Sequence, residues 1–347
     1  MTASKMHSLP RLAGWLPAVL LLLLLVAVLI SAGIGAVSLP LRSLTAYAVG
    51  MEHLTADQAT ILWVIRLPRI FAAVIVGSCL STAGLLFQGL FRNPLADPYV
   101  IGSSGGAVLG ASLGIFVVPA FTFAGFSAIA VMAFAGSVGT IVLVYWLASS
   151  NGRTPTVALL LAGFVVGTML SYFAYFLESL DHDFGAGMHV LSAWLHGSVT
   201  QPTWAQLAIA AVALVLGFAA AIPLARRLNT LALGEEYALH LGISLEQMRI
   251  AVIVIGSLLT AVAVALGGLI GFIGLIVPHT LRLIVGSDHV RLLPATAVAG
   301  GLFLLVADTA ARTVMAPSEL PVGVLTAMIG GPFFLFLLRK ARREALS

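Results

Sequence analysis

The chain has 347 residues, of which 60% are hydrophobic and 9% are charged, and its net charge is +4 at neutral pH. A soluble domain carries about 25% charged residues, so this composition excludes an ordinary soluble globular protein. The single cysteine, Cys79, excludes an intrachain disulfide, and its apolar surroundings predict a buried thiol. Unbroken apolar tracts of roughly 20 residues match membrane-spanning helices, whereas barrel strands would alternate apolar and polar residues. We therefore predict an all-α polytopic membrane protein.

The apolar tracts predict ten membrane-spanning helices that form a single transmembrane domain over residues 1–347. They lie near 12–37, 61–89, 98–118, 124–148, 155–178, 203–225, 249–268, 271–286, 293–312 and 321–340. The first tract follows Lys5 and Arg11, as in a secretory signal, but it continues past Val37, so we expect a retained helix. A turn at Gly267 and Gly268 separates the seventh span from the eighth.

The basic residues predict the orientation of these spans. An even number of spans places both termini on one side, and arginine and lysine concentrate in cytoplasmic loops. With both termini in the cytoplasm, thirteen basic residues lie inside and four lie outside, namely Arg42, Arg66, Arg69 and Arg312. This asymmetry supports both the number of spans and the cytoplasmic termini.

Small residues and one charge pair inside the spans predict helix packing. Glycines spaced four residues apart form ridges over 106–114 and 163–167, and such ridges let helix backbones approach closely in lipid. Asp308 and Arg312 are also four residues apart, a spacing that favours a local ion pair on one helix face.

The longest cytoplasmic connection, Leu228–Arg249, has the pattern of a structured surface. Gly242 is suited to end a short helix in the left-handed conformation, and Ser244 with Gln247 forms an S-x-x-Q capping box that would start another. We expect an amphipathic pair of short helices that lies on lipid or docks a soluble partner. Two adjacent glutamates in the loop favour the partner, because an anionic lipid surface repels them.

The segment Arg66-Leu67-Pro68-Arg69 is an unusual feature of the predicted outer face. Pro68 suits an early helical turn, and two arginines in one turn are rare on the outer side. These arginines are either snorkelling anchors or an electrostatic contact for an acidic external partner.

Sequence motifs for catalysis are absent from the chain. The two lysines, Lys5 and Lys340, do not follow a glycine-rich loop, so there is no P-loop and we predict that this chain cannot hydrolyse ATP alone. His279 has no second ligand at metal-binding spacing, and we predict no metal site there. An ion-coupled secondary carrier remains an alternative, although no acid or histidine lies clearly at mid-membrane. A membrane enzyme is the third class considered, but this chain has no credible catalytic group for one.

Five motifs together resemble the FecCD family, the permease subunits of type II ABC importers for cobalamin, ferric siderophores and heme. They are RLPR at 66–69, FRNPLADP at 91–98, LALGEEYALHLG at 231–242, GFIGLIVPHTLR at 271–282 and ELPVGVLTAMIGGPFF at 319–334. They occur in order over nearly the whole chain. Within the family, AVSLPL at 36–41 and the ART…ELPVG pattern at 311–323 are most similar to the heme permeases.

The resemblance implies ten helices per subunit and a homodimer with one path at its two-fold axis, in the bacterial inner membrane. It implies two separate ATP-binding cassette subunits on the cytoplasmic side, which hold ATP and Mg, and a periplasmic substrate-binding protein outside. The permease itself would hold no permanent cofactor, and nucleic acid is not an expected partner. The implied activity is import by alternating access, with heme as the leading cargo and a ferric siderophore or cobalamin as the alternative.

The resemblance also assigns roles to individual positions. The docking site for the binding protein corresponds to Arg66, Arg69 and Arg312. The ATPase-coupling surface corresponds to Leu233, Gly234, Glu235, Glu236, His240, Leu241 and Gly242. The cytoplasmic gate corresponds to Asn93, Leu95, Thr154 and Thr156.

The segment 184–200 corresponds to a re-entrant element of the family, and here the chain departs from its relatives. His196 stands where many relatives have methionine, so that His182, His189 and His196 gather near the outer mouth. Histidine and methionine can ligate heme iron. Met188, His189 and His196 are therefore candidate substrate-path residues, either as transient iron contacts or as polar lining.

Overall fold

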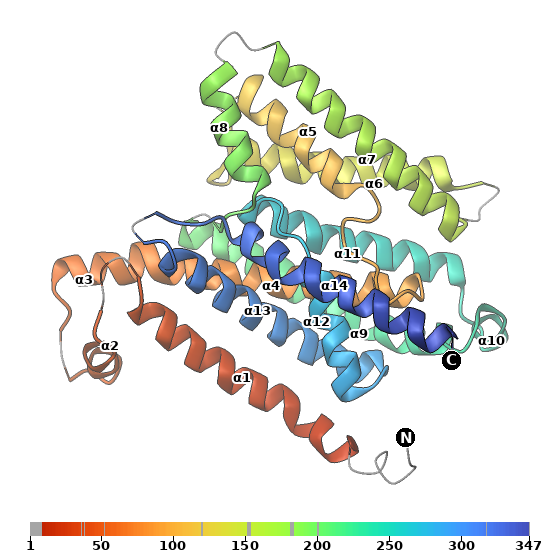
Figure 1. The fold of residues 1–347 in the computed structure, drawn as a ribbon, viewed down its shortest axis with the longest axis horizontal. Coiled ribbons are helices and arrows are strands. Elements are labelled where there is room, and N and C mark those ends of the chain that lie inside the picture. Colours follow the sequence, from red (N-terminus) through yellow and green to blue (C-terminus); the bar gives the residue numbers. More distant parts are fainter. Residues whose placement is uncertain are drawn as a thin grey trace.

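The computed structural model describes residues 9–346 except 36, 38, 52, 119–120, 151–153, 181–183, 200 and 317, and the fold in these residues is almost entirely helical (Figure 1). The helices are α1 (Leu9–Gly33), α2 (Leu41–Ala48), α3 (Ala56–Thr60), a π-helix (Ile61–Arg66), α4 (Leu67–Leu90), α5 (Ser103–Phe116), α6 (Ala128–Ala148), α7 (Thr156–Ser179), α8 (Phe184–Leu195), α9 (Trp204–Leu231), α10 (Glu235–His240), α11 (Leu245–Gly267), α12 (Ile273–Val285), α13 (His289–Thr313) and α14 (Val322–Leu346). Two short antiparallel strands, β1 (Thr122–Phe123) and β2 (Phe126–Ser127), precede α6.

Each of the ten predicted spans coincides with a helix. Among the described residues, seven helices are long and apolar enough to cross a membrane: α1, the continuous helix Ala56–Leu90, α6, α7, α9, α11 and α13. Three shorter apolar helices, Ser103–Phe116, Ile273–Val285 and Val322–Phe336, match the remaining predicted spans. The expected all-α membrane fold is confirmed, and the count of ten crossings stays a prediction.

Helix α4 is the centre of the packing. It lies against α13, α11, α9 and α12, and nearly all of its residues are buried. A Cβ at Gly77 would overlap the carbonyl oxygen of Gly300, and a Cβ at Gly84 would overlap that of Gly274. These helices therefore approach one another at distances that only glycine permits.

Helices α5 to α8 gather on one side of the molecule in Figure 1, and α11 contacts both α6 and α4. The predicted glycine ridges form the contacts in this group. Gly110 packs against the backbone of Met132 in α6, and Gly167 packs against Gly102 at the start of α5. The packing interpretation of both ridges is confirmed.

The ends of the bundle carry different elements. Figure 1 shows α10 at the same end as the start of α1 and the end of α14, while α2 and α3 lie at the opposite end. This is the arrangement that an even number of spans requires. Which end faces the cytoplasm stays a prediction.

The connection between α9 and α11 is shorter than expected. It comprises residues 232–244 rather than Leu228–Arg249, because α9 continues to Leu231 and α11 begins at Leu245. The predicted capping box is wrong: Ser244 precedes α11 but makes no capping hydrogen bond. Its ψ of 103° differs from the 160° and 159° of the two residues that do cap with a glutamine, Thr55 and Thr203. The second expected short helix is thus the first turn of α11.

Two glycine turns were predicted correctly. Gly242 has a φ of +77° after α10, and Gly268 has a φ of +67° after α11. Positive φ is strained for residues with a Cβ, so both glycines end their helices where a side chain would not fit the backbone.

Candidate functional site

The end of α1, the start of α4 and the end of α13 meet around three arginines, at the end of the bundle that carries α3. The π-helix Ile61–Arg66 joins α3 to α4 in one continuous helix, and π-helical turns are frequent at functional sites. Arg66 Nη1 donates to the carbonyl oxygens of Ala32 at 2.7 Å and Gly33 at 3.2 Å, and Nη2 donates to that of Val37. The last carbonyls of a helix lack partners within it, so Arg66 caps the end of α1.

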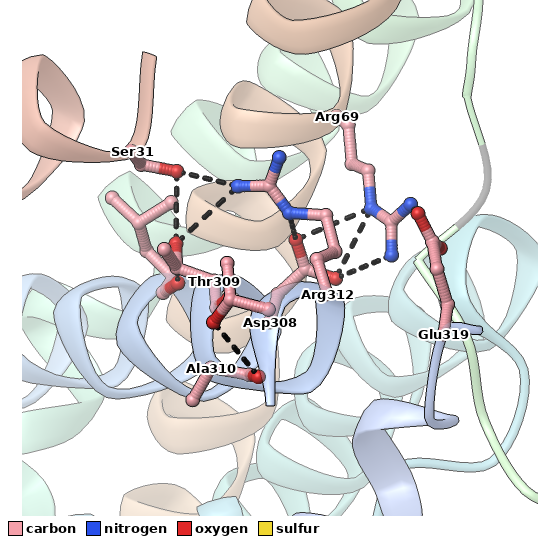
Figure 2. A network of polar contacts seen from close by, with 9 residues as sticks. Ser31, Arg69, Asp308, Thr309, Ala310, Arg312 and Glu319 are labelled. Carbon is pink, nitrogen blue, oxygen red and sulfur yellow. Dashed lines mark hydrogen bonds and ion pairs between the residues drawn. The ribbon is translucent and has the colours of Figure 1, made fainter. Parts of the chain in front are cut away.

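Arg69 is the centre of an ion-pair network, which Figure 2 shows from close by. Its Nη2 lies 3.0 Å from Asp308 Oδ1, and its Nη1 lies 2.7 Å from Glu319 Oε2. Arg312 Nε lies 3.2 Å from the other oxygen of Asp308. The predicted pair of Asp308 with Arg312 is confirmed, but the carboxylate is shared between two guanidinium groups.

The network also connects α13 to α1. Arg312 Nη2 donates to Ser31 Oγ at 2.7 Å, and Thr309 Oγ1 donates to the same oxygen at 2.8 Å (Figure 2). Because Asp308 is fully buried and hydrogen-bonded charge pairs are costly to break in a low-dielectric interior, this network holds these ends of α1, α4 and α13 together.

The three arginines assigned to docking are buried. The structure brings Arg66, Arg69 and Arg312 together as expected, yet their exposed fractions are only 4%, 7% and 7%. They are not an exposed basic face, because backbone carbonyls, Asp308 and Glu319 already bind them. The Glu319 side chain is 53% exposed and is the accessible part of the network.

At the other end of the bundle, α10 presents an exposed surface. Ala238 is its only fully buried residue, whereas Leu233, Tyr237 and Leu241 are each about two-thirds exposed. The remaining residues assigned to ATPase coupling are Gly234, Glu235, Glu236, His240 and Gly242. Of these, Gly234 and Glu235 are half-buried and the others are exposed. Tyr237 also lies on this surface, although it was not among the residues assigned to ATPase coupling from the sequence. A tyrosine in a short helix can be buried or exposed, and its residue type does not show which.

The four residues assigned to the cytoplasmic gate lie in two places, the turn after α4 and the start of α7. Asn93 is exposed and its Oδ1 accepts from the backbone N–H of Leu95 at 3.0 Å, which closes the turn after α4. Thr154 is 1% exposed, and its hydroxyl donates to Glu246 Oε1 at 2.7 Å. Thr156 is the half-buried first residue of α7. In this structure the Thr154 hydroxyl is therefore bonded to Glu246 of α11.

The turn that contains Asn93 also carries a perturbed carboxyl group. Asp97 Oδ1 accepts from the backbone N–H of Tyr99 at 2.9 Å. Burial raises the pKa of Asp97 to about 6, and the hydrogen bond from Tyr99 opposes this rise. The turn therefore contains a carboxyl group whose charge is sensitive to pH near neutrality.

The candidate path residues lie on and after α8. Met188 is half-buried, whereas His189 and His196 are exposed, and the backbone carbonyl oxygen of Ser192 lies 2.6 Å from His196 Nδ1. A carbonyl only accepts, so Nδ1 is the donor in this contact. His182 lies outside the described residues.

The two exposed histidines do not form a common metal-ion site. They are seven residues apart, which is about 10 Å along a helix and too far for one ion. Within the described part of the chain, no group of three or more potential ligands is suited to a metal ion. His196 instead lines a cavity of about 690 Å³ together with Phe272 and Met328.

Comparisons with known proteins agree on one class of membrane protein. The FecCD transport family matches residues 23–340. The chain is 39% identical over 329 residues to the hemin transport system permease protein HmuU of Yersinia pestis, covering 94% of this chain and 95% of that protein. It is 42% identical over 311 residues to the cobalamin import system permease protein BtuC of Halobacterium salinarum, covering 89% and 82% respectively.

A solved structure supports the same conclusion at the level of the fold. An inward-facing conformation of a metal-chelate type ABC transporter matches with a TM-score of 0.81 and 33% identity. The match covers 93% of this chain and 98% of the other.

Proposed function

The chain belongs to the FecCD transport family and is the permease of an ABC importer, and we propose that its cargo is an iron chelate, with heme as the leading candidate. The observation that carries the choice of heme is His196, an exposed histidine that lines a cavity and uses Nδ1 in a contact with the backbone of Ser192. Neutral imidazole is a common axial ligand of heme iron. A transient contact suits a transporter, because tight binding would hold the cargo. The alternative cargo is a ferric siderophore or cobalamin.

The proposed assembly is a homodimer with two ATP-binding cassette subunits and a periplasmic binding protein, in the bacterial inner membrane. A long exposed apolar stripe on α7, which includes Phe164, Met169, Tyr172 and Phe176, supports this assembly. A stripe of this size needs lipid, cargo or another subunit to cover it. We assign it to the second copy and to the path between the copies.

The proposed attachment of the ATPase subunits is through α10. Leu233, Tyr237 and Leu241 provide exposed apolar contact area, while Glu236 and His240 provide polar groups between them. A short helix with exposed leucine and tyrosine side chains suits insertion into a groove of a soluble partner. ATP hydrolysis in that partner would then drive alternating access.

We propose that the binding protein docks at the ion-pair network of Arg69, Asp308, Arg312 and Glu319 by exchanging one ion pair for another. Since Arg69 is paired with Glu319, an incoming carboxylate would replace Glu319 rather than approach a free arginine. The half-exposed position of Glu319 makes this exchange accessible from the surface.

The cargo is tested by measuring ATPase activity of the reconstituted permease, ATPase and binding protein with hemin, a ferric siderophore or cobalamin. We expect hemin to give the strongest stimulation and uptake into proteoliposomes. Stronger stimulation by cobalamin or by the siderophore would replace heme as the cargo. Uptake by this chain alone, driven by an ion gradient, would overturn the proposed ATP-driven mechanism in favour of a secondary carrier.

A further inference from the structure

A polar network at the α10 end of the bundle centres on Arg249, a residue in the first turns of α11. Its Nη2 donates to Glu235 Oε1 in α10 at 2.9 Å. Its Nη1 donates to the backbone carbonyl oxygen of Thr154, which precedes α7, at 3.3 Å. One guanidinium group therefore bonds at the same time to the exposed α10 and to a residue assigned to the gate.

Glu246, one turn before Arg249, completes the connection. Its Oε1 accepts from the Thr154 hydroxyl at 2.7 Å, and its Oε2 accepts from the Thr154 N–H at 3.3 Å. The hydroxyl of Tyr145 at the end of α6 donates to the same carboxylate at 2.7 Å. All three polar groups of Thr154 are thus bonded to two residues of α11, so the start of α7 follows any displacement of these two side chains.

Helix α10 is suited to move as a unit at this position. It is flanked by Gly234, whose φ is +130°, and Gly242, whose φ is +77°, and Ala238 is its only fully buried residue. Helix α11, in contrast, packs along its length against α4, α6 and α9. A displacement of α10 therefore acts on Glu235 at its first turn while the backbone of α11 stays in place.

We propose that Arg249 is a positioning residue that transmits movement of α10 to the cytoplasmic gate by holding Glu235 and Thr154 in one guanidinium fork. The proposal rests on the proposed function, because α10 takes its role as coupling helix and Thr154 its role in the gate from it. Arginine is required by the geometry, because its planar fork presents two N–H groups in fixed directions, whereas the single ammonium of lysine cannot hold both acceptors in this way.

A neighbouring arginine, Arg92, cannot take the place of Arg249 in linking α10 to Thr154. Arg92 lies 4.0 Å from the same Glu235 oxygen, and both side chains are close to half exposed. Exposed pairs at that distance are screened by solvent and contribute little. No hydrogen bond joins Arg92 to Thr154 among the bonds of the described residues, so Arg92 contacts α10 without reaching the gate.

The decisive variant is Arg249→Lys in the complete complex of permease, ATPase and binding protein, reconstituted in nanodiscs and proteoliposomes. We expect assembly and basal ATP hydrolysis to remain near the wild-type level. Stimulation by the loaded binding protein and uptake per ATP should fall roughly fivefold or more, as expected for loss of a coupling interaction. Arg291→Lys is the matched control, because Arg291 forms an exposed ion pair with Asp288 at 3.5 Å and, among the described residues, has no hydrogen bond or ion pair to α10 or Thr154.

A second variant separates transmission from attachment of the ATPase. Glu235→Gln breaks the α10 half of the fork at a side chain that is 43% exposed, so folding should be retained. If both residues act in one relay, the double variant should lose little more stimulation than either single variant. Multiplicative losses would mean that Glu235 acts on the ATPase directly, and would overturn the relay.

The outcomes also distinguish this proposal from the proposed function. A wild-type complex without stimulation or uptake would refute the ABC-importer assignment of the cargo and partners. A stimulated wild-type complex with equally stimulated Arg249→Lys would refute the relay alone. If Arg249→Lys does not assemble, Glu235→Gln provides the test: reduced stimulation with unchanged affinity for the ATPase supports the relay, and wild-type stimulation or weakened ATPase binding overturns it.

Discussion

At the scale of single residues, the structure changes what the outer arginines mean. Asp308 is fully buried and is held by Arg69 and Arg312 together. Reversing either arginine would leave a buried charge without compensation, which costs about 3–5 kcal/mol and would destabilise the permease itself. A loss of docking in such a variant would say little about a direct contact. Glu319 is the better position for an experiment, because it is half exposed.

We predict that Glu319→Gln strengthens association with the binding protein. The variant removes the carboxylate that competes for Arg69 and keeps the shape of the side chain. An exposed pair contributes roughly 0.2–1 kcal/mol, so the dissociation constant should fall by up to about fivefold at low salt. The measurement is binding of the loaded binding protein to the permease complex in nanodiscs at two ionic strengths.

The control for this prediction is Asp57→Asn, since Asp57 is an exposed outer carboxylate in α3 without an ion pair to the three arginines. An equal gain in Asp57→Asn would indicate a general effect of outer charge. Unchanged affinity in Glu319→Gln would refute the exchange of carboxylates at Arg69.

At the scale of helices, glycine decides how closely α4 packs. Gly84 meets the backbone of Gly274 at the start of α12, and this contact leaves no space for a Cβ. In lipid the hydrophobic effect does little to drive helices together. Close backbone packing therefore contributes a larger part of the stability than it does in a soluble protein. The elements around the site depend on this packing, because α12 and α13 both lie on α4.

We predict that Gly84→Ala lowers the thermal stability of the detergent-solubilised permease. Overpacking costs about 1–3 kcal/mol, and we expect the upper part of this range because the Cβ would meet backbone atoms of Gly274. That cost exceeds the gain of roughly 1 kcal/mol from replacing a helical glycine by alanine. Gly139→Ala in α6 is the matched control, because nothing lies within 4 Å of a Cβ at Gly139. Equal unfolding temperatures for the two variants would contradict the packing argument.

At the scale of the whole molecule, the two ends of the bundle carry the two proposed partner surfaces. The arginine network and Glu319 lie where α4 begins and α13 ends, and α10 lies at the end that also carries the start of α1 and the end of α14 (Figure 1). A permease driven by ATP must receive cargo at one end and energy at the other. The relay through Arg249 belongs to the energy-receiving end.

The orientation can be tested by labelling with a membrane-impermeant thiol reagent. Cys79 is fully buried, so an introduced cysteine should be the reactive one without removal of the native residue. We expect Glu319→Cys to react in intact spheroplasts, and Glu236→Cys to react only in inverted vesicles. The reverse pattern would place the termini outside and would contradict the positive-inside assignment.

The sequence by itself determined the membrane class, the positions of the helices, the glycine ridges and the family. The length of an apolar tract, the helical spacing of its residues and the position of a glycine can each be seen in a short stretch of sequence. The bilayer sets the length of a spanning helix and favours small residues where helices pack. Only the tertiary structure decided that the outer arginines are internally paired and that Arg249 reaches Thr154. Arg69 and Glu319 are 250 positions apart, and Thr154 and Arg249 are 95 apart. Local pattern cannot pair such residues, because the contact depends on how distant helices pack in space.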